Sequence, residues 1–428
     1  MTENKAKQKV TFSKYQVFII AVLSFIQFTV ILDFMVLSPL GAQLMQELSV
    51  NPQQFGMVVS AYAFSAGIAG ILAAGFADKF DRKKLLMFFY VGFVIGTLLC
   101  GLAPDYNALL VGRVVTGIFG GVISSVSFAI ITDLFAMEMR GRVMGFVQMS
   151  FAASQVLGIP VGLLLANHFG WHAPFLMIVG TSILAGIIMV MYMKPVTEHL
   201  KLRSEKNAFR HLVKTVSKPD YLKGFLATTL LATGGFMLMP FGSAFSINNL
   251  KLTNEQLPVL YGITGVFSII FGPLLGKLSD KIGKYNMFVI GSALTMLMVG
   301  IYTNMAATPL WIVIILNVIL FVGISSRMIS ASALMSALPE PQDRGAFMGI
   351  NSSVQQLSGG IAAAIAGMIV VKTQSGVLER YNILGYVVIA AMLITIGMMY
   401  FINKLIMNKK PIQMPQRPAV EETVVTEA

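Results

Sequence analysis

The chain has 428 residues, of which 56% are hydrophobic and 12% are charged, and it carries a formal net charge of +12. Soluble domains contain about 25% charged residues, so this composition excludes a water-soluble globular protein. The single cysteine, Cys100, excludes an internal disulfide bond.

Apolar stretches follow one another along the chain, and each is long enough to cross a hydrocarbon core about 30 Å thick, which needs about 20 residues per helix. The first stretch contains Asp33 and has no small-residue cleavage pattern, so we interpret it as a retained helix rather than a signal peptide. Twelve membrane spans are predicted, at residues 15–38, 56–76, 85–104, 108–132, 143–167, 173–193, 223–247, 257–278, 286–304, 309–333, 346–371 and 382–406.

Polar segments divide these spans into two sets of six. The last segment is rich in Pro, Glu and Thr and has too little apolar content to pack. We predict a cytoplasmic N-terminal tail (1–14), a first six-helix bundle (15–193), a cytoplasmic linker (194–222), a second six-helix bundle (223–408) and a disordered cytoplasmic tail (409–428).

Lysine and arginine residues outside the spans are concentrated on the side that carries both termini. Only Lys251, Lys372 and Arg380 fall on the opposite face. By the positive-inside rule, we predict a multi-pass protein of the plasma (inner) membrane with both termini in the cytoplasm. The positive charge is then a consequence of topology, so we expect the lipid bilayer, and no nucleic acid, as a partner.

Two sequence features each occur twice. A turn of similar sequence is found at residues 74–83 and 276–284, and an Arg-Gly pair is found at residues 140–141 and 344–345. A repeat of membrane halves is typical of secondary transporters. We therefore predict an all-α membrane protein whose twelve transmembrane helices form two pseudo-symmetric six-helix bundles.

Two residues of opposite charge, Asp33 and Arg113, lie inside predicted spans 1 and 4. An arginine at the bilayer centre costs at least about 2.5 kcal/mol, so Arg113 needs a carboxylate or carbonyl partner. Asp33 is the acidic residue that lies well inside a span, which makes it the natural partner. We hypothesise that Asp33 binds the coupling proton and that Arg113 modulates its charge, because burial favours a neutral carboxyl group and a nearby arginine favours a charged one. A permanent structural ion pair is the alternative.

The turn at residues 74–83 resembles the signature loop of the major facilitator superfamily, and the chain is most similar to that family's twelve-helix drug/proton antiporters. The resemblance implies a conformational gate. With the outer side open, Asp78 would face the positive N-terminal end of the helix near Ala346, and Asp280 that of the helix near Val143. In the alternative interpretation, these charges only anchor the topology. The predicted gate residues are Asp78, Lys79, Arg82, Lys83, Asp280 and Lys281.

Spans 1 and 4 also carry the resemblance. Residues 31–36, around Asp33, resemble the acidic first-helix motif of drug antiporters. Residues 109–117, around Arg113, resemble the family's second motif, whose arginine lies in the membrane. The resemblance therefore supports the proton-coupling hypothesis for these two residues.

Span 5 contains a degenerate copy of the antiporter motif, made of Gly158, Pro160 and Gly162. Glycines four residues apart allow close approach of another helix, and a proline kinks its own helix. The resemblance implies that this segment packs against span 8 and limits leakage. A generic packing kink is the alternative.

The resemblance further implies a central cavity lined by spans 1, 4, 5, 7, 8, 10 and 11. A carboxylate in this cavity, from Asp33, would favour cationic or neutral cargo. Arg327 has three open interpretations: it contacts an anionic group of the substrate, pairs with Asp33 through the cavity, or snorkels to the inner surface. The substrate-binding candidates are the polar residues Gln27, Gln148, Gln155, Asn317, Arg327, Asn351, Gln355 and Gln356 and the apolar residues Phe34, Met35, Met237, Met239 and Tyr261.

The expected function is secondary active transport, in which a small organic or amphipathic, drug-like compound is exported in exchange for protons by alternating access. A sugar or metabolite transporter of the same fold, either proton-coupled or facilitative, is the alternative, and a non-transporting membrane sensor is a third. The sequence contains no metal-ligand cluster, phosphate-binding loop or nucleophile triad. We therefore expect a monomer that is not an enzyme and that uses the proton gradient rather than a cofactor.

Overall fold

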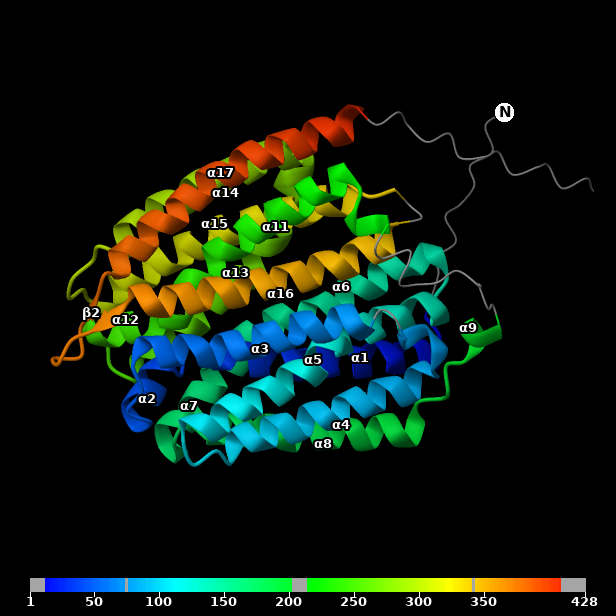
Figure 1. The fold of residues 1–428 in the computed structure, drawn as a ribbon, viewed down its shortest axis with the longest axis horizontal. Coiled ribbons are helices and arrows are strands. Elements are labelled where there is room, and N and C mark those ends of the chain that lie inside the picture. The colour runs from blue at the N-terminus through cyan, green and yellow to red at the C-terminus, as the bar shows by residue number, and fades with distance from the viewer. Residues whose placement is uncertain (1–11, 74–75, 202–213, 341–342, 409–428) are drawn as a thin grey trace, which may run out of the picture.

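The computed structural model describes residues 12–73, 76–201, 214–340 and 343–408, and these form long helices that run side by side (Figure 1). The first half contains α1 (Lys14–Val36), α3 (Pro52–Ala73), α4 (Arg82–Gly101), α5 (Tyr106–Leu134), α6 (Met137–Ala153), the π-helix η2 (Ser154–Gly158), α7 (Ile159–Phe169) and α8 (Ala173–Tyr192). The second half contains α11 (Pro219–Leu238), α13 (Gln256–Ile282), α14 (Lys284–Tyr302), α15 (Leu310–Ala337), α16 (Arg344–Ile369) and α17 (Tyr381–Asn408).

Short elements join the long ones. They are α2 (Gly41–Glu47), η1 (Ala77–Lys79), α9 (Glu198–Lys201), η3 (Met239–Phe241), α12 (Gly242–Asn248) and an antiparallel hairpin of β1 (Val371–Lys372) and β2 (Leu378–Glu379). Residues 1–11 of the predicted N-terminal tail, the predicted C-terminal tail and the middle of the predicted linker fall outside the described residues. Helix α1 begins at Lys14, inside the predicted N-terminal tail, and α11 begins at Pro219, inside the predicted linker.

All twelve predicted spans coincide with helical segments. Within the described residues, 11 of these segments are long and apolar enough to cross a membrane. The twelfth is α16, which is 26 residues long but more polar than the others. A polar helix among apolar ones is expected to face the interior of the protein rather than lipid, and α16 lies at the centre of the molecule (Figure 1).

Local sequence fixes where several of these helices begin. Ser13 and Gln16 form a capping box before α1, in which each side chain accepts a hydrogen bond from the other residue's backbone N–H, at 3.2 and 3.0 Å. Asp105 precedes α5 and accepts the Ala108 N–H at 2.8 Å. These caps satisfy N–H groups that the first turn of a helix leaves without partners.

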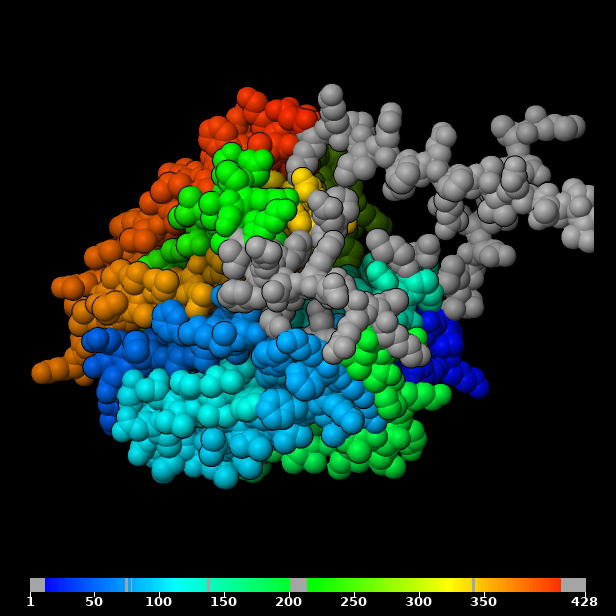
Figure 2. Space-filling view, turned by 45° about the vertical axis from the view of Figure 1, so that its right-hand side comes forward, coloured from blue at the N-terminus to red at the C-terminus, as the bar shows by residue number. Residues whose placement is uncertain are grey.

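The two bundles meet along α3 and α16, which lie side by side in both views (Figures 1 and 2). The helix backbones approach closely, because a Cβ at Gly56 would lie 2.8 Å from the Ala363 carbonyl oxygen. The second contact joins η2 and α7 to α13, where a Cβ at Gly265 would lie 2.9 Å from Val156 Cα. Glycines therefore let the two halves pack backbone against backbone.

We call the end at which α1 begins and α17 finishes the terminal end, and the opposite end the far end. Hydrogen bonds that cross between the bundles in the described part of the chain lie in the far half. The Ser243 hydroxyl donates to the Ser38 carbonyl at 2.8 Å, and Asn167 Nδ2 donates to the Asn254 carbonyl at 2.9 Å. These bonds close the far end.

The terminal end is packed less closely. A Cβ at Gly349 of α16, which borders a cavity between the bundles, would meet no other atom within 4 Å. The described residues therefore show a conformation that is closed at the far end and has space between helices toward the terminal end.

Candidate functional site

The predicted partners Asp33 and Arg113 form a buried ion pair between α1 and α5. Arg113 Nη1 donates to Asp33 Oδ2 at 2.7 Å and to the Asp33 backbone carbonyl at 3.3 Å. The Thr97 hydroxyl of α4 donates to Asp33 Oδ1 at 3.2 Å. The side chains of Arg113 and Asp33 are 1% and 0% exposed, so the pair is sealed from solvent and lipid in this conformation.

Glycines bring α4 and α5 close enough to enclose the pair. A Cβ at Gly96 would lie 2.6 Å from Thr116 N, and a Cβ at Gly112 would lie 3.0 Å from Cys100 N. Larger residues at these positions would force the two backbones apart. Because Thr97 follows Gly96 and Arg113 follows Gly112, the same close contact positions both side chains beside Asp33.

Tyr62 of α3 covers the remaining side of the ion pair. The Arg113 guanidinium carbon lies 4.6 Å from the centroid of the Tyr62 ring, within the range of a cation–π interaction. Arg113 Nε and Nη2 have no hydrogen-bond partner among the described residues. The guanidinium contacts the Tyr62 ring instead.

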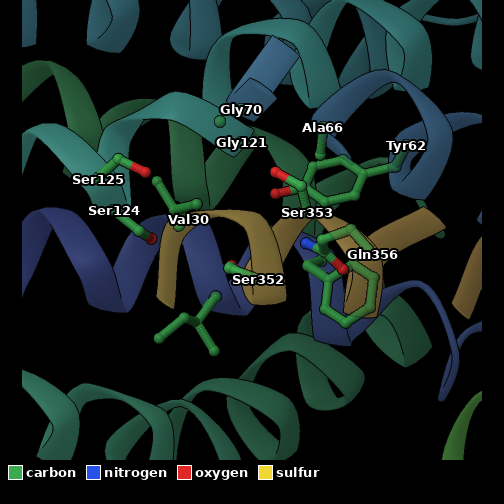
Figure 3. Close-up of a pocket in the computed structure, with 14 residues that line it drawn as sticks. Val30, Tyr62, Ala66, Gly70, Gly121, Ser124, Ser125, Ser352, Ser353 and Gln356 are labelled. Atoms are coloured by element: carbon green, nitrogen blue, oxygen red, sulfur yellow. The ribbon is translucent and has the colours of Figure 1, made fainter. Parts of the chain in front are cut away.

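A cavity lies between the two bundles, on the other side of Tyr62 (Figure 3). Its volume is about 110 Å³, below the roughly 300–1,000 Å³ of sites for drug-sized ligands, so it must widen to hold such a compound. None of the side chains that line it is charged. The lining comes from α1, α3, α5 and α16: Val30, Ile31, Phe34, Tyr62, Ala66, Gly70, Gly120, Gly121, Ser124, Ser125, Gly349, Ser352, Ser353 and Gln356.

The prediction that Asp33 contributes a carboxylate to the cavity is wrong for this conformation. Its bonds to Arg113 and Thr97 direct the carboxylate toward α4 and α5, and Tyr62 lies between the pair and the cavity. The next residue on α1, Phe34, does line the cavity. Asp33 is therefore one side chain behind the cavity wall.

Most of the predicted substrate-binding residues lie elsewhere. Phe34 and Gln356 line the cavity, whereas Gln27 bonds to Ser124 and Ser127 between α1 and α5. Met237 and Asn317 are buried, Gln148 is exposed, Asn351 accepts a bond from Thr228, and Gln155 and Gln355 are partly buried away from the cavity lining. Four serines and Tyr62 were missed, because small polar residues and single tyrosines are common on helix-packing faces and carry no distinguishing pattern.

The family was tested by comparison with known proteins. The model of the Major Facilitator Superfamily matches residues 23–363. The chain belongs to this superfamily. It is therefore a multi-pass membrane transporter, and its fold and family are those of transporters rather than enzymes.

Bacterial transporters are among the relatives of this superfamily member. Multidrug resistance protein 2 of Bacillus subtilis is 22% identical over 349 residues, which cover 80% of this chain and 86% of that protein. Multidrug resistance protein 3 of the same organism is 34% identical over 149 residues, 35% of this chain and 29% of that protein. The bicyclomycin resistance protein homologue of Haemophilus influenzae is 24% identical over 349 residues, 79% of this chain and 86% of that protein.

Solved structures share the fold at low sequence identity. A D-xylose–proton symporter aligns with a TM-score of 0.72 and 18% identity, covering 89% of this chain and 97% of that one. A bacterial homologue of the human lysosomal transporter Spinster, in an inward-facing and unoccupied conformation, aligns with a TM-score of 0.69 and 16% identity, covering 92% of this chain and 97% of that one. These likenesses establish the major facilitator fold.

The antiporter-like motif forms a break in its helix. Ser154–Gly158 is a π-helix in which the Ile159 N–H bonds to the Ser154 carbonyl, and Pro160, which has no N–H, follows directly. Cβ atoms at Gly158 and Gly162 would meet Leu32 and Val36 of α1, so the glycines pack on α1 rather than on span 8. Pro160 does lie on α13, which is span 8, at 3.6 Å from a Cβ at Gly262.

The predicted gate residues of the first half are held within their own bundle. Arg82 Nε pairs with Asp133 Oδ2 at 3.1 Å. Lys83 Nζ donates to the carbonyls of Val190 and Met193 at the end of α8, at 3.0 and 2.5 Å, where a helix C-terminus favours a cation. Lys79 is exposed, and the Asp78 side chain lies outside what the structure describes.

The gate residues of the second half are exposed. The Asp280 carboxylate is 72% exposed and pairs with Lys284 on the next helix, and Lys281 is also exposed. The predicted contact of Asp280 with the helix near Val143 is not made here. That contact was predicted for the conformation with the outer side open, so it stays a prediction for the other state.

Arg327 lies in the interior of the second bundle. It is 4% exposed, its Nε donates to the Ser292 hydroxyl at 3.1 Å, and its guanidinium lies 5.7 Å from the Phe288 ring centroid. It therefore does not snorkel to the surface, and it does not pair with Asp33. The ion pairs found among the described residues do not include Arg327.

Proposed function

We propose that this major facilitator protein exports small organic, drug-like compounds in exchange for protons by alternating access. The observation that carries the proposal is the fully buried Asp33–Arg113 pair, which lies one side chain behind the wall of a cavity shared by both bundles. Ionisable residues inside the membrane are costly, and they typically mark ion pathways and proton relays.

The pair supports proton coupling through a change of charge. An ionised Asp33 accepts the hydrogen bond of Arg113 at 2.7 Å, and the pair is then neutral overall. A proton on Asp33 leaves the buried guanidinium without a counter-ion, which favours a rearrangement that separates the two groups. The protonation of Asp33 is thereby linked to which end of the molecule is open.

The direction of transport follows from the topology. The distribution of Lys and Arg supports a cytoplasmic terminal end. In this conformation the far end is closed by bonds such as that between Ser243 and Ser38, and the cavity reaches toward the terminal end. Cargo would therefore enter from the cytoplasm and leave after the bundles rock and open the far end. The proton gradient supplies the energy, without a cofactor.

The cavity supports an aromatic and uncharged cargo. Phe34 and Tyr62 offer ring faces, and none of the lining side chains is charged. Relatives called multidrug resistance proteins support a drug-like compound. A sugar or metabolite carrier is the second candidate, which is favoured by the hydrogen-bonding groups of Ser124, Ser125, Ser352, Ser353 and Gln356.

We expect uncharged aromatic compounds to be carried in preference to permanent cations. Cargo enters a cavity whose lining has no carboxylate, so a cation would lose hydration without gaining a counter-ion. Susceptibility assays in an efflux-deficient bacterial host would compare chloramphenicol with tetraphenylphosphonium. Expression should raise the inhibitory concentration of the uncharged compound about tenfold more than that of the cation. Equal or stronger protection against the cation would contradict the uncharged cavity as the cargo site.

Proton exchange can be tested directly in inverted membrane vesicles, whose outer face corresponds to the cytoplasm. An imposed acidic lumen should drive uptake of whichever compound the susceptibility assay identifies, and a protonophore should stop it. Exchange of one proton for one uncharged molecule moves one net charge, so the membrane potential is clamped at zero with valinomycin and potassium, and each pH unit then drives about tenfold accumulation. Uptake that only equilibrates the compound, whatever the pH difference, would identify facilitated diffusion and overturn the antiport proposal.

A further inference from the structure

Tyr62 separates the cavity from the buried ion pair. One face of its ring lies 4.6 Å from the Arg113 guanidinium, and the same side chain lines the cavity, into which it projects in Figure 3. The residue is 2% exposed, so the ring fills the space between the two sites rather than leaving a channel past it. Asp33 is reached from the cavity by moving this side chain.

The other described contacts of the Asp33 carboxylate come from α4 and α5. Helix α4 contributes Thr97 and Cys100, and α5 contributes Arg113. The ionisable groups that face the carboxylate are therefore Tyr62 from α3, Cys100 from α4 and Arg113 from α5. Because α4 and α5 touch backbone to backbone at Gly96 and Gly112, the two helices cannot separate there without losing this contact.

The Tyr62 backbone is fixed, whereas its ring is not anchored. A Cβ at Gly117 of α5 would lie 3.0 Å from Tyr62 Cα, so the two helices hold that backbone in place. The Tyr62 hydroxyl makes no hydrogen bond to any described residue, and its ring rests on Arg113, on Phe34 and on the glycine face of α5. A buried tyrosine usually bonds its hydroxyl, so the Tyr62 ring lacks a hydrogen bond that would fix its position.

A row of rings links Tyr62 to the opposite bundle. The centroids of Tyr62 and Phe34 are 5.2 Å apart, and those of Phe34 and Phe236 are 5.7 Å apart. Phe236 belongs to α11 of the second bundle, whereas Phe34 belongs to α1 of the first. Phe236 and Phe34 belong to different bundles, so movement of one bundle against the other would change the support behind the Tyr62 ring.

We propose that Tyr62 is the movable cover of the coupling carboxylate: its ring keeps cavity water from Asp33 while the far end is closed, and its displacement when the bundles rock and open the far end lets a proton reach Asp33. Tyr62 controls access to Asp33 and does not itself bind the proton, so it is a positioning residue. The inference rests on the proposed proton exchange. A cover of this kind explains how a fully buried acid takes part in exchange with water only at one stage of the cycle.

The test measures how fast Asp33 reacts with a carbodiimide in the purified full-length protein in liposomes, without cargo. Dicyclohexylcarbodiimide modifies protonated carboxyl groups, and mass spectrometry follows the peptide that carries Asp33, with Asp33→Asn as the blank. Tyr62→Ala should speed labelling about tenfold and shift its pH profile, because the ring over the guanidinium is removed and water enters. Tyr62→Phe keeps the ring and should restore slow labelling.

Tyr90→Ala is the matched control, because it removes a buried ring from the same bundle that stacks on Phe93 rather than on Arg113. Labelling as slow in Tyr62→Ala as in the wild type would overturn the cover, and so would equally fast labelling in Tyr90→Ala. If Tyr62 controls labelling but Asp33→Asn still transports cargo uphill, the cover stands as an access barrier and its coupling role is overturned together with the proposed function. If Asp33→Asn stops transport while labelling is independent of Tyr62, the cover alone is wrong.

Discussion

Asp33→Asn is expected to abolish proton-driven uptake in inverted vesicles and to lower the free energy of unfolding by about 3–5 kcal/mol. Transport stops because an amide does not exchange a proton in the usable pH range. Stability falls because the Arg113 side chain, which is 1% exposed, is left without a counter-ion. Unfolding in detergent and vesicle uptake measure the two effects separately.

The double variant Asp33→Asn/Arg113→Gln distinguishes a coupling pair from a structural one. Two amides can hydrogen-bond to each other and leave no buried charge, so we expect most of the stability to return. Proton-driven transport should stay lost, because neither residue can bind the proton. Glu379→Gln removes an exposed carboxylate from β2 and should change neither quantity.

The opposite result would identify a structural role. If the double variant regains uphill transport together with stability, the pair only holds α1, α4 and α5 together, and another group must carry the proton. The single and the double variant are both needed, because loss of transport in Asp33→Asn alone could arise from unfolding.

The ion pair could be predicted from the sequence because the membrane makes each partner costly. A buried Arg113 requires an acceptor because its burial is costly, and Asp33 is the acid that lies well inside a span. Asp33 is therefore the partner that the sequence predicts, and the structure shows this contact. The same reasoning left three interpretations open for Arg327, which is also buried but rests on Ser292 and Phe288. The free-energy cost of burying a charged side chain shows that the charge needs a partner. It does not say whether that partner is a carboxylate, a hydroxyl or an aromatic ring.

The spans could be predicted, and the cavity could not. Apolar length predicts 11 of the spans, and span 11 is also predicted although the polar residues of α16 lower its hydropathy. Which face of a helix meets the cavity depends on its rotation, and that is set by close contacts such as Gly67 against Leu357. Gln355 and Gln356 are neighbours in sequence, yet only Gln356 lines the cavity. Neighbouring helical residues point about 100° apart, so a small rotation decides between them.

Replacing Gly56 by leucine is expected to prevent closure of the far end and to stop transport. A Cβ at this position would lie 2.8 Å from the Ala363 carbonyl oxygen and 3.2 Å from Gly367 Cα, so α3 and α16 can touch there only if residue 56 has no side chain. Overpacking of this kind costs about 1–3 kcal/mol. The cost applies to the closed conformation alone, so the population of the closed far end should fall about tenfold or more.

The closed population can be measured by cross-linking across the far end. Asn167 and Asn254 belong to opposite bundles and share a hydrogen bond of 2.9 Å, so cysteines at these two positions, in a Cys100→Ser background, should be joined by a short bifunctional reagent when the far end is closed. Gly56→Leu should reduce this yield about tenfold. Gly180→Leu is the matched control, because a Cβ there would meet no atom within 4 Å.

The same experiment decides whether contact between α3 and α16 is required for the transport cycle. Gly367→Leu disturbs the same contact from the other bundle, since a Cβ at Gly367 would lie 2.8 Å from the Pro52 carbonyl oxygen. This variant should also lose both far-end cross-linking and transport. Full cross-linking in both variants would mean that the helices separate locally while the far end still closes. In that case α7 and α13, rather than α3 and α16, would have to hold the bundles together at the far end.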